Sequence, residues 1–365
     1  MLENNALERQ RRVERVKSTW VTVRLRDISF RIDQRVPLVA LALLIFTAVV
    51  LVLSISYGEY DIAPLDVVNT LLDTNQDHPD YSNLRLVVYT FRLPRIVLAF
   101  LVGAALATSG ALLQGITRNP LADPYLLGVV SGASLAAVIL IVWLKDLPFY
   151  ILPWAAFGGA MLTAAVVYAL AWRGGNSSPM RLILIGIAVE GVLMAITELF
   201  LVFGDIYDVQ QAYVWLAGSV YGRSWEHVRA LGAWMVVFIP LAFLGARGLN
   251  MLGMGDDAAK GLGLRVEQHR AFLLIVSVAL AGAAVAVAGA IGFVGLVAPH
   301  ITRRLVGPTH EGLLPVSAML GGALMVVADL IGRWIITPSE LPVGIVTAMI
   351  GAPYFIYLLI RNRNR

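Results

Sequence analysis

The sequence contains no cysteine and few charged residues. Of its 365 residues, 14% are charged and 58% are hydrophobic, and the mean hydropathy is +0.77. Without cysteine the chain can form neither disulfide bonds nor thiolate metal sites. A soluble domain of this length needs far more charge on its surface, so the composition predicts an all-α polytopic membrane protein.

Two kinds of motif that would give the chain chemistry of its own are also missing. The five histidines form no pair at a ligand spacing such as HxxxH or HExxH, so we expect no metal site. No GxxxxGK[ST] phosphate-binding loop is present. We therefore expect no catalytic residue and no directly bound cofactor, and any ATP and magnesium would have to bind to a partner.

Long apolar runs account for most of the chain. Each is long enough to cross roughly 30 Å of hydrocarbon as a helix, straight or kinked. The ten runs are residues 37–57, 93–114, 124–143, 149–172, 181–203, 230–247, 271–290, 292–306, 313–335 and 342–360. The run at 292–306 is the weakest, because it is short and contains Pro299 and His300. Residues 37–365 are thus predicted to form one membrane domain of about ten transmembrane helices.

Basic residues are distributed unevenly between the two ends of these runs. Of the 28 Lys and Arg residues, 21 fall on the side of the N-terminus and 7 on the other. Cytosolic loops are enriched in positive residues, so both termini and the segment 247–270 are predicted to be cytosolic. Residues 1–36 form a basic leader without the cleavable apolar core of a secretory signal. Within it, Val16 to Ile32 either lies on anionic lipid or is disordered.

The run at 93–114 is rich in glycine, alanine and serine. Small residues let helices approach closely where lipid offers no hydrophobic driving force, so this helix is predicted to be central. The two prolines of residues 118–124 then predict a tight cytosolic reversal. Gly128, Ser131 and Gly132 continue the small-residue pattern, either as broken backbone at the wall of a translocation path or as packing residues.

Four residues are unusual for hydrocarbon. Glu190 and Asp329 place carboxyl groups inside apolar runs, at a cost of ~2.5–3.5 kcal/mol each unless they are paired or face water. They are either bonded to neighbouring helices or carry a coupling ion. Pro299 frees a backbone carbonyl, which must find another partner. His300, beside it, is either a packing residue or part of a gate or proton relay.

The polar interval 247–270 has the pattern of a compact helix-turn-helix. Asp256 and Asp257 fit the opening turn of a first helix, which Gly261 would end. A second helix is predicted to begin near Val266. An ordinary membrane turn needs fewer residues, so the interval is interpreted as a surface that receives a partner, with a plain solvated loop as the alternative.

Five stretches of the sequence jointly resemble the FecCD family, the membrane permeases of ABC importers for ferric siderophores, haem and vitamin B12. They are RLPR from Arg92 with LVGAALATSGALLQ and RNPLADP; WLAGS from Trp215; LGMGDDAAKGLGL; GAIGFVGLVAPHITRRLVG with His310 and LLP; and ADLIGR with ELPVGIVTAMIGAPYF. The resemblance covers nearly the whole chain beyond the leader. It implies the type II ABC importer permease fold, similar to the vitamin B12 permease, with ten helices.

The same resemblance implies partners and site residues. The partners would be a second permease subunit, two cytosolic ATPases and an extracytoplasmic binding protein within membrane lipid, and no nucleic acid is expected. The coupling helices that enter the ATPase cleft would comprise Leu252, Gly253, Met254, Gly255, Asp256, Asp257, Ala258, Ala259, Leu262 and Gly263. Arg92, Arg95 and Arg333 would pair with acidic residues of the binding protein; without the family, their charges would be expected at lipid headgroups.

The expected function is therefore that of a permease subunit that carries a ferric siderophore across a bacterial cytoplasmic membrane. The MGDD form of the coupling loop and the basic leader favour a siderophore over vitamin B12 or haem, which remain the alternative. A secondary transporter that uses Glu190 and Asp329 would show inverted repeats, and none is visible. A channel or structural membrane protein would have no use for the helical interval. Which siderophore is carried stays open, as does the permease pairing, for which a heterodimer is favoured.

Overall fold

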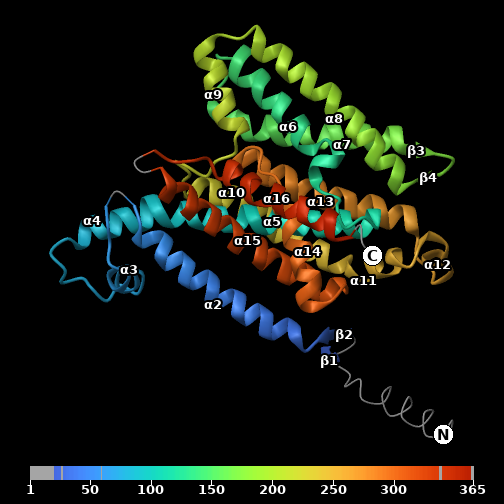
Figure 1. Cartoon of the computed structure of the whole chain (residues 1–365), viewed down its shortest axis with the longest axis horizontal. Helices are drawn as coiled ribbons and strands as arrows, with labels where there is room; N and C mark the ends of the chain where they lie inside the picture. The colour runs from blue at the N-terminus through green and yellow to red at the C-terminus, as the bar shows by residue number, and fades with distance from the viewer. Residues whose placement is uncertain (1–19, 26–27, 59, 337–338, 363–365) are drawn as a thin grey trace, which may run out of the picture.

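The computed structural model describes all residues except 1–19, 26–27, 59, 337–338 and 363–365. Its long helices run roughly along one axis of the molecule (Figure 1). The helices that coincide with the ten predicted runs are α2 (Arg35–Ser56), α5 (Leu93–Thr117), α6 (Val129–Val138) continued by the π-helix η3 (Ile139–Trp143), α7 (Leu152–Ala171), α8 (Pro179–Val202), α10 (Trp225–Leu244), α13 (Val266–Ala288), α14 (Val294–Val306), α15 (His310–Ile335) and α16 (Val343–Asn362).

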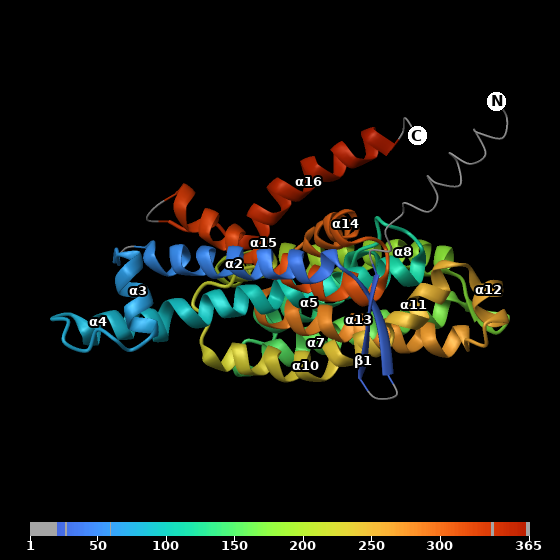
Figure 2. The same ribbon diagram turned by 90° about the horizontal axis from the view of Figure 1, so that it is seen from below.

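Short elements connect these helices. They are α3 (Pro64–Leu71), α4 (Tyr81–Leu86), η1 (Val87–Arg92), η2 (Pro124–Leu127), η4 (Phe149–Ile151), α9 (Ile206–Leu216), α11 (Ala246–Gly253), α12 (Asp256–Gly261) and the strand pair β3 (Trp172–Arg173) and β4 (Asn176–Ser177). Helices α11 and α12 lie at one end of the bundle, the coupling end, and α3 and α4 lie at the opposite end (Figures 1 and 2).

Seven of the described helices are long and apolar enough to cross a membrane by themselves. Two of the ten predicted spans form shorter helices: α6 with η3 (Val129–Trp143) and α14. Helix α14 is short because the chain breaks before it, where Phe293 adopts a left-handed backbone with φ 67°. Left-handed backbone is rare for a bulky residue, so the apolar pattern alone could not place this break.

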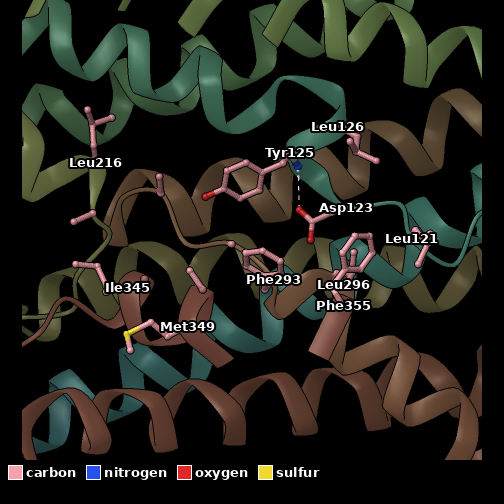
Figure 3. Close-up of a pocket in the computed structure, with 15 residues that line it drawn as sticks. Leu121, Asp123, Tyr125, Leu126, Leu216, Phe293, Leu296, Ile345, Met349 and Phe355 are labelled. Atoms are coloured by element: carbon pink, nitrogen blue, oxygen red, sulfur yellow. Dashed lines mark hydrogen bonds between the residues drawn. The ribbon is translucent and has the colours of Figure 1, made fainter. Parts of the chain in front are cut away.

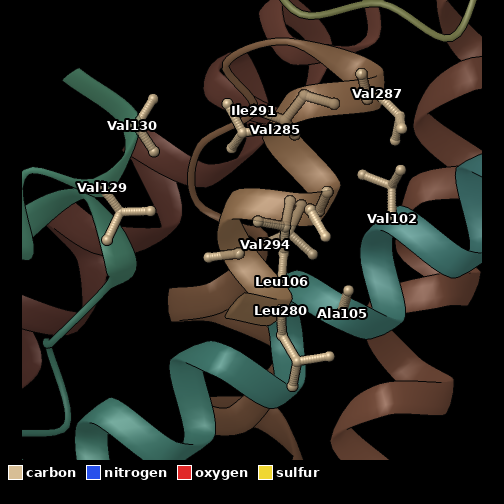
Figure 4. Packing of buried hydrophobic residues seen from close by; sticks show 14 of the residues in the cluster. Val102, Ala105, Leu106, Val129, Val130, Leu280, Val285, Val287, Ile291 and Val294 are labelled. Atoms are coloured by element: carbon tan, nitrogen blue, oxygen red, sulfur yellow. The ribbon is translucent and has the colours of Figure 1, made fainter. Parts of the chain in front are cut away.

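Helices α5 and α13 form the centre of the bundle. In each, 83% of the most apolar window is buried, compared with 11% in α10 and 17% in α8. Figure 4 shows Leu106 of α5 and Leu280 of α13 gathered in one group with Val294 of α14. The prediction that the small-residue helix is central is confirmed. The apolar surfaces of α8 and α10 are left to face lipid or a partner.

Glycine lets α5 touch two neighbouring helices at backbone distance. A Cβ atom on Gly103 would lie 2.1 Å from the carbonyl oxygen of Gly321 in α15, and one on Gly110 would lie 1.9 Å from that of Gly295 in α14. No Cβ can occupy such positions, so these two contacts require glycine. This is the close packing that the small residues predicted.

The leader contains an element that the sequence analysis did not predict. Strands β1 (Trp20–Leu25) and β2 (Ile28–Asp33) pair as an antiparallel hairpin, from Trp20↔Asp33 to Leu25↔Ile28. Part of the proposed lipid-lying or disordered segment is therefore β-structure, outside the helical membrane domain. Alternation of apolar and polar residues at a period of two is the strand pattern. Residues 1–19 of the leader lie outside the described residues.

Candidate functional site

The coupling end carries the polar interval 247–270, which we name the coupling segment. Its helices have other bounds than the sequence predicted. Helix α12 covers Asp256–Gly261, as the acidic opening turn and the glycines indicated. The second predicted helix is not short, because Val266 begins the long α13. The missed short helix is α11, which follows α10 with only Gly245 between them. An apolar run and an amphipathic helix in direct succession give no composition break that would separate them.

Two glycines set the path of the chain around α12. Gly255 before the helix has φ 103°, and Gly263 after it has φ 86°. Both angles lie where a residue with a Cβ is strained, so the turns at the two ends of α12 depend on glycine. The helix is thereby held as a separate unit between α11 and α13.

The apolar residues of the coupling segment face two directions. Leu252 is 1% exposed and Ala259 is fully buried, so both pack against the bundle itself. Met254 and Leu262 are 64% and 59% exposed, and Ala258 is exposed beside them. The surface that a partner can reach therefore comprises Met254, Ala258 and Leu262, while Leu252 and Ala259 attach the segment to its own chain.

A buried arginine ties α12 to the bundle. Arg270, in the second turn of α13 and 1% exposed, donates from Nη2 to Asp256 Oδ2 at 2.8 Å. Its Nη1 donates to Glu267 Oε1 and, at 2.6 Å, to the carbonyl oxygen of Ser177. Glu267 in turn accepts hydrogen bonds from the backbone nitrogen and hydroxyl of Ser177, at 3.0 and 2.7 Å. The carboxylate of Asp256 also pairs with Arg118 at 3.2 Å.

This network joins four segments that are distant in sequence. Asp256 belongs to α12, Arg270 to α13, Ser177 to the hairpin between α7 and α8, and Arg118 to the turn after α5. A buried guanidinium with three acceptors fixes their relative positions, because losing any partner would leave a buried charge unpaired. Asp256 was predicted both as a helix-start residue and as a coupling residue. Arg270 was not predicted, although the Glu267–Arg270 spacing of three residues was an available signal.

Helix α11 is separately bonded to the first two residues of α15. Asn250 Oδ1 accepts hydrogen bonds from the backbone nitrogen of His310 at 3.0 Å and from its ring Nδ1 at 2.7 Å. The amide of Asn250 donates to Glu311 Oε2 at 2.7 Å. The coupling segment is therefore bonded through Asn250 on one side and through Asp256 on the other.

At the opposite end, the three arginines of the resemblance lie in one group with two carboxylates. We name Arg92, Arg95, Asp329, Arg333 and Glu340 the arginine cluster. Arg95 donates to Asp329 from Nε at 3.1 Å and from Nη2 at 2.8 Å, and to Glu340 from Nη1 at 2.7 Å. Arg333 pairs with Asp329 at 3.3 Å and donates to the carbonyl oxygens of Tyr57 and Ser54, each at 3.0 Å.

Within the described residues, the hydrogen bonds of Arg92 are to backbone carbonyl oxygens. Its guanidinium donates to the carbonyl oxygens of Ile55, Ser56 at 3.3 Å, and Tyr60 at 2.6 Å. The side chains of Arg95 and Arg333 are only 12% and 7% exposed. The structure thus uses all three arginines inside the chain, where they hold α2, α5 and α15 together.

The two carboxyl groups inside apolar runs differ in surroundings. Asp329 is 2% exposed between Arg95 and Arg333. Of the two alternatives, it therefore fits the carboxylate that is bonded to a neighbouring helix. Glu190 in α8 is half-buried, and no hydrogen bond or ion pair joins it to another described residue. The two residues lie on different helices and do not form a common site.

A pocket of about 600 Å³ that opens to the surface lies beside Asp123 (Figure 3). Its walls come from the turn after α5, the end of α9, the link from α13 to α14, and α16. Residues at its wall include Asp123, Tyr125, Phe293, Ile345 and Met349. The lining is largely apolar, and Asp123 supplies a carboxylate that is 8% exposed.

Asp123 was not among the predicted site residues. Its Oδ1 accepts a hydrogen bond from the backbone nitrogen of Tyr125 at 3.1 Å, which caps η2 and shapes the reversal after α5. Burial, with a smaller contribution from the nearby Glu190, raises the pKa of Asp123 to about 6. Its place directly before Pro124 was the available sequence signal.

The remaining candidate path residues take the following positions. A Cβ on Gly128 would lie 2.8 Å from the Thr163 side chain, and one on Gly132 would lie 2.5 Å from the carbonyl oxygen of Gly159, so both glycines allow α7 to approach. Ser131 donates to the carbonyl oxygen of Gly128 at 3.1 Å. These contacts describe packing, and a role in a translocation path stays a prediction.

Pro299 and His300 lie on α14. The freed carbonyl of Gly295 accepts a hydrogen bond from Gln114 Nε2 at 3.4 Å, which is the substitute partner that the proline predicted. The ring of His300 packs edge-on against Tyr354 of α16 at 6.2 Å. Neither of its ring nitrogens is hydrogen-bonded to a residue that the structure describes.

A bundle of membrane-spanning helices, with a coupling segment at one end that is bonded to it through Asn250 and Asp256, is typical of a membrane transport subunit. The chain belongs to the FecCD transport family, whose model matches residues 44–361. It is 43% identical over 338 residues to the probable siderophore transport system permease protein YfhA of Bacillus subtilis, covering 91% of this chain and 97% of that protein. It is 46% identical over 280 residues to the cobalamin import system permease protein BtuC of Halobacterium salinarum, covering 77% and 74%.

A solved structure has the same fold. It is an inward-facing conformation of a putative metal-chelate type ABC transporter, with a TM-score of 0.79 and 30% identity, covering 89% of this chain and 99% of that one. The resemblance to FecCD permeases and the predicted fold class are therefore confirmed.

Proposed function

We propose that this chain is the permease subunit of an ABC importer that moves a ferric siderophore across the cytoplasmic membrane. The observation that carries the proposal is the exposed surface of Met254, Ala258 and Leu262 on helices that are separately bonded to the bundle. A chain without a phosphate-binding loop needs such a contact surface if ATP hydrolysis by a separate ATPase is to drive its transport.

The share of each relative that this chain matches supports a ferric siderophore as the substrate. The siderophore permease relative matches almost its whole length, whereas the cobalamin permease relative matches 74% of its own. Cobalamin or haem is the second candidate, because the cobalamin permease relative is 46% identical within the matched part. A secondary transporter has less support, because Asp329 is already neutralised by two arginines.

The cytosolic side is assigned to the coupling end. Two ATPase subunits would dock there, one on each permease of a pair. At the opposite end the arginine cluster would receive acidic residues of the binding protein. Direct docking on Arg95 and Arg333 requires their internal bonds to rearrange, because both side chains are largely buried.

Uptake by the reconstituted complex tests the proposal. The permease, its partner permease, the ATPase and the binding protein are placed in vesicles, and ATP-driven uptake of ferric siderophores, haem and cobalamin is measured side by side. We expect uptake of a ferric siderophore that needs both ATP and binding protein. Uptake of cobalamin alone would select the alternative, and uptake driven by a proton or sodium gradient without ATP would reject the ABC permease.

Docking is tested on Arg92, whose hydrogen bonds to the described residues are with carbonyl oxygens and not with Asp329 or Glu340. Arg92→Glu should slow association with the binding protein at low salt and have less effect at high salt, because such charges steer encounter. An association rate that Arg92→Glu leaves unchanged at both salt concentrations would remove Arg92 from the docking site.

A further inference from the structure

The arginine cluster contains two carboxylates in different situations. Asp329 is 2% exposed and is held between Arg95 and Arg333. Glu340 is 30% exposed, and within the described residues its ion pair is with Arg95. Asp329 is therefore an interior component of the cluster, whereas Glu340 closes it from the outside.

The guanidinium of Arg95 divides its donors between these two acids. Nε and Nη2 face Asp329, at 3.1 and 2.8 Å, and Nη1 faces Glu340 at 2.7 Å. A guanidinium presents its donors in a rigid planar fork, so the edge held by Asp329 fixes the direction of the other edge. Nη1 stays aimed at the surface whichever carboxylate it meets.

The charge balance of the cluster depends on Glu340. Arg95 and Arg333 face Asp329 and Glu340, so these two positive charges meet two negative ones. If Glu340 moved away, one positive charge would be left in excess. A carboxylate from another protein at Nη1 would restore the original balance.

We propose that Glu340 occupies, in the free permease, the position that a carboxylate of the binding protein takes when it docks. This rests on the proposed function, in which the binding protein docks at the arginine cluster. The exchange replaces one carboxylate by another, so Arg95 is never left unpaired. Ion pairs at partly exposed positions contribute little net stability, so Glu340 can be displaced, whereas the buried Asp329 cannot.

The position of Glu340 connects this exchange to α16. Glu340 lies three residues before Val343, the first residue of α16. Leu341, between them, donates to the carbonyl oxygen of Gly332 at 3.0 Å, and Gly344 in the first turn of α16 donates to that of Gly218 at 3.1 Å. Helix α16 also supplies part of the wall of the pocket beside Asp123. Release of Glu340 thus changes the restraint on the start of a helix that lines this pocket.

The test compares Glu340→Gln with Asp77→Asn in the full transporter complex. Asp77 is an exposed acid at the same end of the bundle, so its variant removes one negative charge without touching Arg95. Affinity for the binding protein is measured by surface binding at two salt concentrations, with thermal unfolding as a check on folding. We expect Glu340→Gln to strengthen binding by about threefold to tenfold, and Asp77→Asn to change it by less than about twofold.

A second variant covers the case in which glutamine keeps a hydrogen bond to Arg95. Glu340→Ala removes both charge and acceptor, and it should strengthen binding at least as much as Glu340→Gln. Affinities of both variants equal to that of Asp77→Asn would overturn the proposal. Weakened binding would also overturn it, because Glu340 would then be a residue that orients Arg95 for docking. If the wild-type complex binds no binding protein at all, the docking function itself fails, and this is distinguished before any variant is measured.

Discussion

Arg270 of α13 donates to Asp256 of α12 across 2.8 Å, while the same guanidinium is bonded to the hairpin between α7 and α8. The residue is 1% exposed, so its charge is balanced inside the protein and not by water. A displacement of α12 by a partner must therefore displace these bonded segments or break a buried ion pair, which is costly. The pair thus connects the partner-facing surface to the transmembrane helices.

The first prediction concerns this connection. Asp256→Asn removes the charge that pairs with both Arg270 and Arg118, so transport per ATP hydrolysed should fall about tenfold while the complex still assembles. The measurement is ATP-driven uptake alongside ATP hydrolysis in reconstituted vesicles. Asp77→Asn is the control, since Asp77 is an exposed acid between α3 and α4 at the opposite end of the bundle and should keep normal coupling. Equal coupling in the two variants would show that the Asp256 ion pairs do not transmit motion.

A second prediction separates the exposed face of α12 from its buried face. Ala258→Asp places a charge among Met254 and Leu262 without changing any contact inside the chain, so the permease should fold but lose binding-protein-stimulated ATP turnover. Ala258→Ser, which is small and uncharged, should retain most of it. Co-purification with the ATPase and stimulated hydrolysis are the readouts. Full stimulation in Ala258→Asp would place the ATPase contact elsewhere.

The third prediction concerns glycine packing. Gly110→Ala should prevent normal assembly of α5 with α14, because the added Cβ would lie 1.9 Å from a carbonyl oxygen. Gly232→Ala is the control: a Cβ there has no neighbour within 4 Å, and alanine in a helix interior should stabilise by roughly 0.5–1 kcal/mol. Thermal unfolding in detergent compares them. A Gly110→Ala protein as stable as wild type would contradict the backbone contact.

The fourth prediction concerns the pH dependence of stability. Burial in the fold raises the pKa of Asp123 to about 6, from its ordinary value of 3.8, and so favours its protonated form. That contribution is fully present below about pH 4 and is lost as pH rises through about 6. The Tm of the wild type should therefore fall between about pH 4 and about pH 6 as Asp123 loses its proton, and Asp123→Asn should reduce that fall. Asp257→Asn should not, and an identical pH profile for wild type and Asp123→Asn would refute the prediction.

Much of this protein was determined by its sequence alone. The ten apolar runs coincide with ten helices because hydrocarbon imposes a minimum length and composition on any segment that crosses it. The glycines and alanines of residues 93–114 identified the central helix because only small residues permit backbone contact. The acidic start of α12 was likewise readable, since helix ends have local chemistry.

Tertiary structure decided what long-range contacts control. The break at Phe293 and the separation of α11 from α10 have no local signal strong enough to predict them. Neither does the pairing of Arg95 with Asp329, which are 234 residues apart, or of Arg270 with Ser177, which are 93 apart. A sequence shows that a buried charge needs a partner, but the partner is chosen by which helices pack side by side.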